Sequence, residues 1–411
     1  MVNRMPNNLI VISIDGLSPR YLGPYGNTWL DTPAINALAA KGILFENIIA
    51  EQLQPQQALR STFDSWETSK QPDSQQALGF QEREFRSILI SQSPNAESAQ
   101  DWSNIFDEIQ HVNLNQWTRA ENWSETNLAN LFAVLIQQLG ELHTCPESAD
   151  HPFFVWCDSQ ALLNCWDAPE ILAQQFYAAD DPAPYASVSP PTGSIDVDDV
   201  DPDLLLSYVH AYAAQVTLID HCLAALLAFL DEHSLCETTQ IALTSSCGYP
   251  LGEHGVVGCL PNCVYSEAIH IPLIISQLDS KYQARRYQNI GQLRQLAQVL
   301  LSPLLLDNSL STGTATSLEA KLNEFLVSST LRPFARVNTS RKTAIQTPAW
   351  LLVVGEDHRE LFVKPDDRWE VNDVADICHE VTLGLTQLLN REDQANTITD
   401  DIPTFLRKPI D

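Results

Sequence analysis

Short apolar runs alternate with helical patterns from residue 8 to residue 275, and this alternation is what most constrains the fold. The runs have the nearly continuous apolar character of buried strands. Strand and helix in alternation predict an α/β fold with a doubly wound, mostly parallel sheet flanked by helices. In such sheets, ligands bind beyond the carboxyl ends of the strands. The predicted strands are Asn8–Ile14, Ile43–Ile49, Ser87–Ser91, Phe153–Cys157, Gln240–Thr244 and Ile271–Ile275.

Two of the intervening helices have clear boundaries. Thr32 and Pro33 suit the N-cap and first position of a helix that runs to Lys41, and Gly42 is a typical residue after the last turn. Asp201-Pro202 opens a longer helix that continues to about Glu232. Its apolar residues recur at helical spacing and predict a core-facing stripe.

The pattern weakens after about Leu306 and resumes with probable strands at Thr347–Val353 and Glu360–Val363. This spacing predicts a small C-terminal α+β subdomain. We therefore expect a large α/β domain over residues 1–310 and the small subdomain over residues 335–411.

Composition restricts the partners and the compartment. The chain has 411 residues and a formal net charge of -29, and it carries no Lys or Arg between Arg119 and Lys281. Such a field repels nucleic acid and anionic membranes, so neither is expected as a partner. The apolar run at Leu9–Ile14 is too short for a membrane span or a signal peptide, and we expect a cytoplasmic protein. Nine cysteines without a Cys-x-x-Cys pair predict reduced, mostly buried thiols.

Four segments carry motifs in a characteristic order, and together they resemble the sulfatase family of the alkaline phosphatase superfamily. The third contains Thr-Ser-Ser-Cys-Gly followed by Leu-Gly-Glu-His-Gly, close to the family's Thr-Ser-Asp-His-Gly and Leu-Gly-Glu-His-Gly. The resemblance implies a calcium ion held by acidic side chains and Asn or His. It also implies a formylglycine nucleophile made from the Cys or Ser of Cys/Ser-x-Pro-x-Arg, with Lys, His and Arg beside the anion. The segments are Asn8–Gly16 with Tyr21–Gly26 and Thr32-Pro33; Pro152–Trp156 with Trp166–Pro169; Thr244–Gly248 with Leu251–Gly255 and Tyr265–Ile275; and Leu361–Asp376.

The nucleophile and the anion-binding positions of this pattern are changed. Residues 53 to 57 read Leu-Gln-Pro-Gln-Gln, so Leu53 stands where the nucleophile is expected and Gln57 where the Arg is expected. Leucine has no atom that can attack sulfur, and glutamine cannot neutralise an anion. Leu163 falls where the central His is expected. The Lys expected before Tyr265 is missing.

The metal positions are changed as well. Asp15 keeps the first metal carboxylate, whereas Gly16 replaces the second. Ser246 and Cys247 replace the Asp and the His or Asn, and neither suits a hard cation. Asp15 has two interpretations, a cap for the following turn or a remnant calcium contact. His254, in a turn flanked by glycines, is expected to be a hydrogen-bonded structural residue rather than a catalytic base.

These losses favour a pseudo-sulfatase with a binding or regulatory role. We expect no cofactor, and the ligand is unknown. A protein partner, for example an active homologous sulfatase, would fit that role. The competing hypothesis is a divergent metal-dependent sulfuric or phosphoric ester hydrolase. Related branches use an unmodified Ser or Thr, and Ser61 and Thr62 lie close to the expected nucleophile position. This alternative still requires several Asp and His ligands.

Overall fold

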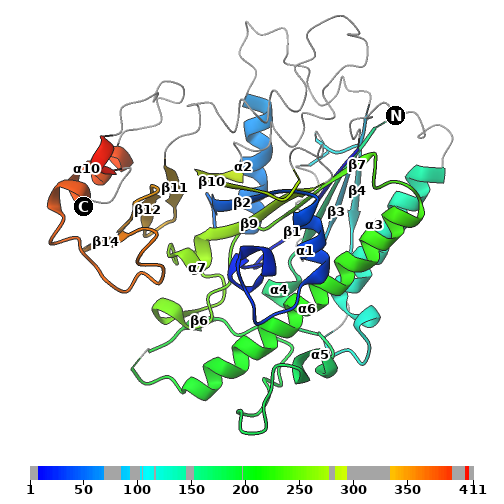
Figure 1. Ribbon diagram of the computed structural model, residues 1–411, viewed down its shortest axis with the longest axis horizontal. Coiled ribbons are helices and arrows are strands. Elements are labelled where there is room, and N and C mark those ends of the chain that lie inside the picture. The colour runs from blue at the N-terminus through cyan, green and yellow to red at the C-terminus, as the bar shows by residue number, and fades with distance from the viewer. Residues whose placement is uncertain are drawn as a thin grey trace, which may run out of the picture.

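An eight-stranded sheet forms the centre of the protein (Figure 1). The structure is a computed structural model, and it describes residues 8–68, 85–92, 102–103, 105–114, 117–144, 152–196, 198–276, 283–293, 334–390 and 403–406. All six predicted strands are confirmed, with ends that differ by two residues or fewer. In spatial order the sheet contains β10 (Arg285–Gly291), β2 (Gly42–Ile49), β9 (His270–Ser276), β7 (Thr239–Thr244), β1 (Asn8–Ile14), β5 (Phe153–Ser159), β3 (Arg86–Ser91) and β4 (Glu108–His111).

The sheet is mostly parallel, as predicted. Strand β1 pairs in parallel with β5 and β7, and β3 pairs in parallel with β4 and β5. Strand β9 runs antiparallel to both of its neighbours, β2 and β7. The carboxyl ends of β1, β5 and β7 therefore meet at one edge of the sheet, where such folds bind their ligands.

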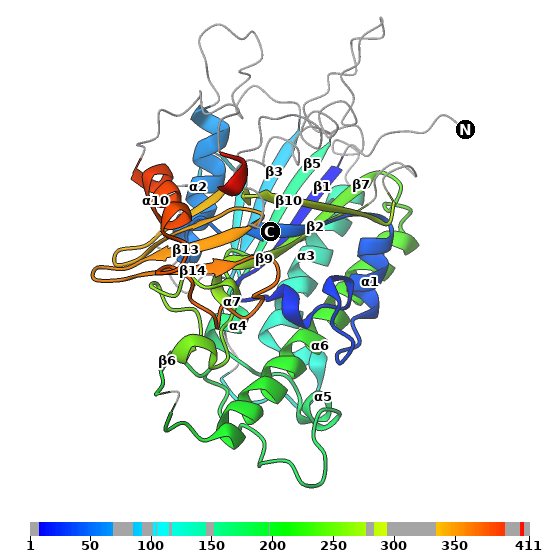
Figure 2. The ribbon, with the colours of Figure 1, turned by 60° about the vertical axis from the view of Figure 1, so that its left-hand side comes forward.

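Both faces of the sheet are covered between its two edge strands, β10 and β4, which explains why the inner strands are mostly apolar. Ile10 and Ile12 of β1 face a cluster formed with α1 (Pro33–Ala40), α3 (Asn127–Thr144) and α6 (Pro202–Glu232). Leu9 and Val11 face the opposite cluster, which includes Phe63 of α2 (Pro55–Thr68) and side chains of the C-terminal subdomain. Figure 2 shows these layers from the side. The shorter elements are α4 (Ala161–Asn164), α5 (Glu170–Gln174), α7 (Ser266–Ile269), β6 (Gly193–Ser194), β8 (Val256–Val257), and the 3-10 turns η1 (Pro19–Tyr21), η2 (Gly23–Tyr25), η5 (Trp123–Glu125), η6 (Glu253–Gly255) and η8 (Thr404–Leu406).

Helix α6 is the long helix predicted from Asp201-Pro202. The Asp201 carboxylate accepts a hydrogen bond from the Asp203 N–H at 3.0 Å, so it caps the first turn. The predicted stripe packs on the sheet, with Tyr212, Val216 and Ile219 fully buried. Length and composition alone would let α6 cross a membrane, but 67% of its most apolar window is buried inside the fold. In this fold α6 is a core helix.

The ends of α1 are determined by tertiary contacts that the sequence does not reveal. Thr32 occupies the N-cap position, but its side chain makes no capping hydrogen bond to the helix. The carboxylate of Asp220, from α6, accepts from Ala34 N and Ile35 N instead. Gly42 already belongs to β2, and a Cβ atom there would lie 1.9 Å from the carbonyl oxygen of Ile275. Gly42 is therefore required for the close approach of β2 and β9. The predicted end of the helix is confirmed, since α1 ends at Ala40 with Lys41 as its C-cap.

The C-terminal subdomain is a four-stranded antiparallel sheet with one flanking helix, in agreement with the predicted α+β character. Its inner face packs on the cluster around Phe63, and its outer face packs on α10 (His379–Asn390). The strand predicted at Thr347 begins only at Trp350, because the Thr347 hydroxyl accepts the Trp350 N–H in a turn. The predicted boundary at residues 311–333 lies outside the described residues, so the division into two domains stays a prediction. The strands are β11 (Ala335–Asn338), β12 (Thr343–Gln346), β13 (Trp350–Val354) and β14 (Arg359–Val363).

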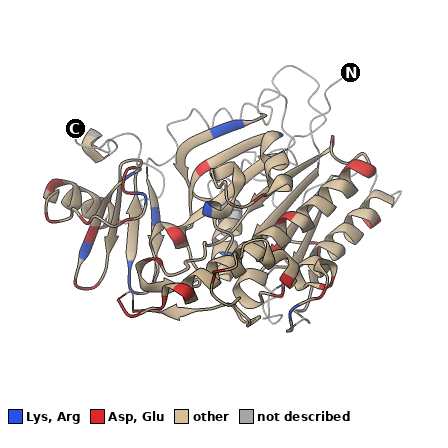
Figure 3. Cartoon of the chain, turned by 60° about the horizontal axis from the view of Figure 1, so that its bottom comes forward, with Lys and Arg blue, Asp and Glu red and all other residues tan. Residues whose placement is uncertain are grey.

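Acidic residues are scattered over the elements of the large sheet and its helices (Figure 3). The stretch without Lys or Arg, from Arg119 to Lys281, includes β5, α6, β7 and β9. Cations near the carboxyl edge of the sheet therefore come from elsewhere in the chain, namely Arg20 and, from the C-terminal subdomain, Lys364.

Candidate functional site

Asp15 lies directly after β1 at the carboxyl edge of the sheet, between the ends of two neighbouring strands. Its backbone N–H donates to the Ser159 carbonyl at the end of β5, at 2.9 Å. The N–H of Gly16 donates to the carbonyl of Cys247, which follows β7, at 3.1 Å. The structure thus brings Asp15 next to Ser246 and Cys247, the residues that replace the expected metal ligands.

The Asp15 carboxylate is buried and only partly satisfied. It is 1% exposed, and its Oδ1 accepts a hydrogen bond from the Ser246 N–H at 3.2 Å. Its Oδ2 has no hydrogen-bond partner among the residues that the structure describes. Burial raises the pKa of Asp15 to about 6, although the hydrogen bond from the Ser246 N–H opposes the shift. A buried carboxylate without a cation favours the protonated form.

Asp158 is a second buried acid at this edge, and the sequence analysis missed it. It lies in β5, is 6% exposed, and accepts a hydrogen bond from the Ser91 hydroxyl at 3.3 Å. Burial and the charge of Asp15 together raise the pKa of Asp158 well above its usual range. The available signal was an aspartate near the carboxyl end of a buried parallel strand.

Leucines fill the positions where the nucleophile and the central His are expected. Leu53 is 4% exposed and packs in an apolar cluster with Cys247 and Cys263. Leu163 packs on both apolar clusters, and a Cβ atom at Gly16 would lie 2.9 Å from its Cδ2. Gly16 also has a φ of +89°, which favours glycine. A second carboxylate at position 16 would therefore collide with Leu163.

Ser246 and Cys247 offer little to a hard cation. Ser246 is 6% exposed, and its Oγ has no hydrogen-bond partner within the described ranges. A hydrogen bond with Cys259, together with burial, holds the pKa of the Cys247 thiol well above its usual range. A thiol that stays protonated is a poor metal ligand, since the thiolate is the binding form.

The alternative nucleophiles Ser61 and Thr62 lie within α2. Their hydroxyls donate to the carbonyl oxygen of Ala58, at 3.0 Å and 2.9 Å. Thr62 is buried, whereas Gln57, in the first turn of the helix, is exposed. Hydroxyls that donate to the preceding helical turn are held away from the role of nucleophile, which requires a base as acceptor.

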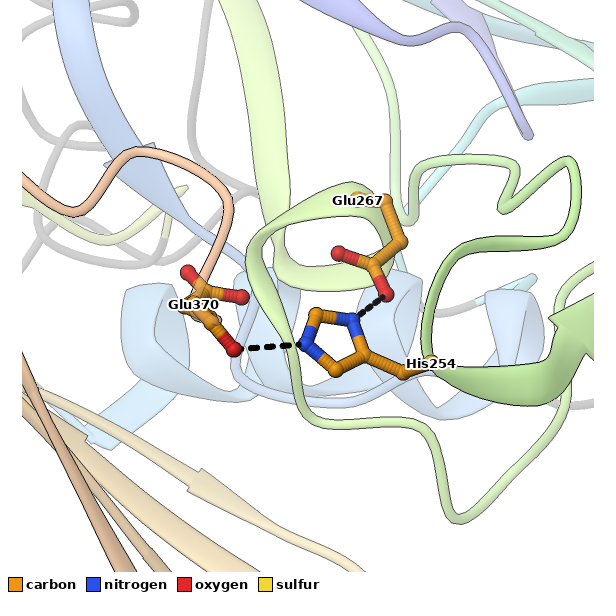
Figure 4. Close-up of side chains that lie close together, drawn as sticks. All are labelled: His254, Glu267 and Glu370. Carbon is orange, nitrogen blue, oxygen red and sulfur yellow. Dashed lines mark hydrogen bonds and ion pairs between the residues drawn. The ribbon is translucent and has the colours of Figure 1, made fainter. Parts of the chain in front are cut away.

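A separate charged cluster surrounds His254, Glu267 and Glu370 (Figure 4). His254 Nδ1 lies 2.7 Å from Glu267 Oε1, and its Nε2 lies 3.2 Å from the backbone oxygen of Glu370. Arg20 Nη2 lies 3.7 Å from Glu267 Oε2, and Lys364 Nζ lies 2.5 Å from Glu370 Oε1. The predicted hydrogen bonding of His254 is confirmed, and its structural role stays a prediction. Its partners Glu370 and Lys364 could not be inferred, because they come from the distant C-terminal subdomain.

The surroundings of His254 favour its charged form. Both of its ring nitrogens face acceptor oxygens, and a proton on each nitrogen would satisfy both. Burial lowers the pKa of His254, but the hydrogen bond and charge of Glu267 outweigh burial and raise it above the ordinary value. The ring also stacks on Tyr265, with centroids 3.9 Å apart and planes 1° from parallel. His254 thus lies beside the two glutamates together with Arg20 and Lys364.

The sequence model of the Sulfatase family matches residues 7–302. The chain belongs to the sulfatase family. No curated protein shows a significant match to the sequence. Among solved structures, the phosphonate monoester hydrolase of Agrobacterium radiobacter is similar at a TM-score of 0.69 and 17% identity, covering 93% of this chain and 94% of that one. A putative sulfatase from Bacteroides thetaiotaomicron is similar at a TM-score of 0.67 and 15% identity, covering 97% and 96%. At these identities the similarity concerns the fold.

Sulfatase-family proteins typically depend on a metal, and the cluster of His254, Glu267 and Glu370 places ligand atoms within 4.8 Å of one another. Three observations oppose a metal there. Lys364 and Arg20 already neutralise the carboxylates, and an imidazolium has no lone pair for coordination. A cation at this position would have to displace a cation of the protein.

The strand-end position does not fit the family's calcium ion either. Calcium takes about six to eight oxygen ligands. Asp15, Asp158 and Ser246 supply buried oxygens here, but Leu163 takes the space beside Gly16 and Cys247 carries a protonated thiol. The donor set is therefore too small for a hard cation.

Proposed function

We propose that this sulfatase-family protein is a non-catalytic pseudo-sulfatase with a binding or regulatory role. The observation that carries the proposal is the burial of Leu53, 4% exposed, in an apolar cluster at the position expected for the nucleophile. A hydrolase of this kind needs a nucleophile and cations aimed at the anionic oxygens. The cations that approach this edge, Arg20 and Lys364, are engaged by Glu267 and Glu370.

The same proposal covers the cellular compartment and the binding partners. With a net charge of -29, a cytoplasmic protein of this kind would bind another protein, such as an active homologous sulfatase, rather than nucleic acid or a membrane. We propose no resident cofactor, and any residual calcium would contact Asp15.

The alternative is a divergent metal-dependent sulfuric or phosphoric ester hydrolase that uses Ser61 or Thr62. It is favoured by the two buried acids, Asp15 and Asp158, because paired carboxylates at strand ends suit a metal. The hydrogen bonds from both hydroxyls to Ala58 oppose it, since these hydroxyls would first have to leave the helix.

An activity assay separates the two functions. The full chain is incubated with calcium, magnesium, manganese or zinc and with an aryl sulfate, a phosphate monoester, a phosphate diester or a phosphonate monoester. The pseudo-sulfatase proposal predicts no turnover above that of the Asp15→Ala variant. Turnover that Asp15→Ala abolishes would overturn it. Loss of that turnover in Ser61→Ala or Thr62→Ala, but not in the Ser65→Ala control on the same helix, would identify the alternative nucleophile.

A further inference from the structure

A small hollow lies where helices α5 and α6 approach Arg119 and the chain segment that carries Tyr185. Its walls are mostly apolar, because four alanines and the rings of Trp166 and Tyr185 line it. Alanine side chains are short, so the elements pack around the space without filling it. The hollow has room for about one water-sized group within its walls, and part of the space is open to solvent. A ligand here must therefore be small. The alanines are Ala168, Ala173, Ala211 and Ala214.

Two polar side chains that line the hollow have unused hydrogen-bonding capacity. The Tyr177 hydroxyl is buried and has no hydrogen-bond partner among the residues that the structure describes. Gln215, on α6, is 5% exposed, and no hydrogen bond joins its amide to another described residue. Buried polar groups are normally hydrogen-bonded, because a donor without an acceptor loses its contact with water and gains nothing in return. Both groups can donate a hydrogen bond to a ligand in the hollow.

Arg119 supplies a positive charge at the same place. Its Nη2 donates to the Tyr185 carbonyl at 2.6 Å, which holds the half-buried guanidinium beside the hollow. No described carboxylate lies within ion-pair distance of Arg119. The chain has 52 acidic and 23 basic residues, so an arginine without a carboxylate partner is unexpected here. A guanidinium has five N–H donors, and the planar carboxylate is the anion that matches two of them in parallel.

We propose that this hollow binds a small carboxylate, of the size of formate or acetate, in contact with Arg119. The carboxylate oxygens accept from the guanidinium, and the Tyr177 hydroxyl and the Gln215 amide supply the further donors. The apolar walls keep water away from these bonds and so strengthen them. A tetrahedral sulfate or phosphate is matched less well, because it is larger and can carry two charges against one cation. The site shares no residue with the strand end at Asp15, so it does not depend on whether the protein hydrolyses an ester.

The test measures binding to the full chain by ligand-observed NMR and by melting temperature, in a buffer free of carboxylates and at constant ionic strength. The probes are formate, acetate, acetamide and sulfate. Acetamide has the shape of acetate without its charge. We expect formate and acetate to saturate one site per chain and to raise the melting temperature. Acetamide and sulfate should bind at least about tenfold more weakly, since a charge-assisted pair with Arg119 is lost or poorly matched.

Three variants and a control locate the site. Arg119→Gln should weaken acetate binding by about tenfold or more. Gln215→Leu and Tyr177→Phe keep most of the side-chain volume, and each should weaken it by about three- to tenfold without lowering the melting temperature of the free protein. The control is Arg86→Gln, at an exposed arginine paired with Glu108, which should leave acetate binding unchanged.

Several results would overturn the proposal. They are the absence of saturable binding of both carboxylates, equal binding of acetate and acetamide, sulfate binding as tight as that of acetate, and acetate binding that Arg119→Gln leaves unchanged. A lower melting temperature of free Gln215→Leu would also contradict the site, because it would mean that the amide already has a partner.

Discussion

Asp15 and Glu370 are both buried carboxylates close to the carboxyl edge of the sheet, yet their surroundings differ. The side chain of Glu370 is fully buried, and its Oε1 lies 2.5 Å from Lys364 Nζ. The backbone N–H and the hydroxyl of Ser266 also donate hydrogen bonds to this carboxylate. Asp15 receives one backbone hydrogen bond from Ser246, and its second oxygen has none among the described residues. One carboxylate has an ammonium group beside it, whereas burial raises the pKa of the other to about 6.

This difference shows how the partners of a buried carboxylate determine its state. The turn with His254 keeps its charges because the C-terminal subdomain supplies Lys364 and the Glu370 backbone oxygen as partners. The strand end keeps Asp15, but leucines and a protonated thiol surround it. Buried charge persists where a partner is present, and it costs stability where no partner remains.

The largest expected effect comes from breaking the paired region. Glu370→Gln keeps the shape of the side chain but leaves the Lys364 ammonium buried without its counter-ion. We expect a loss of about 3 to 5 kcal/mol in the free energy of unfolding, measured by urea denaturation. The matched control is Asp366→Asn, at an exposed acid of the same segment, which should change the midpoint little. Equal effects of the two substitutions would contradict a paired, buried Glu370.

The unpaired region should respond in the opposite direction. Asp15→Asn removes the buried charge whose pKa stands at about 6 instead of 3.8, so we expect a gain of about 1 to 3 kcal/mol at pH 7.5. The control is Asp220→Asn, because that carboxylate accepts two N–H groups at the start of α1. It should lose about 1 to 2 kcal/mol through the N–H left without an acceptor. A destabilised Asp15→Asn variant would mean that the Asp15 charge has a partner.

A smaller change in the free energy of unfolding is expected for each pH unit over which Asp15 titrates. The folded pKa of Asp15 lies above its unfolded value, so its stabilising contribution is full below pH 3.8 and is lost as the pH rises through about 6. Between pH 5 and pH 7 the unmodified chain should therefore lose stability relative to Asp15→Asn, by up to about 1.4 kcal/mol per pH unit. Thermal unfolding of both proteins over this range gives the difference. Parallel curves would contradict the shift.

The sequence predicts the sheet well because its signal is local. Continuous apolar runs identified six of the eight strands, and Asp201-Pro202 marked the start of α6. Strands inside a sheet that is covered on both faces are apolar at nearly every position. The two edge strands, β4 and β10, are polar and were missed. The helix end before Gly42 was predicted correctly, but the close contact of Gly42 with Ile275 of β9 could not be inferred from the sequence.

The site could be predicted only in part. Asp15 and the substituted positions Leu53, Leu163, Ser246 and Cys247 follow from the order of motifs, and the structure brings Asp15 beside Ser246. Asp158 and the partners of His254 could not be found in this way. The His254 contact with Glu370 joins positions 116 residues apart, and no local period reports such a pairing.

Metal binding at the strand end tests the central claim most directly. The full chain and Asp15→Asn are dialysed against calcium, magnesium, manganese or zinc, and bound metal and melting temperature are measured for both. The account predicts no stoichiometric metal, a melting temperature that these cations leave unchanged, and a higher melting temperature for Asp15→Asn than for the unmodified chain. One bound ion per chain, with a rise in melting temperature that Asp15→Asn abolishes, would contradict it.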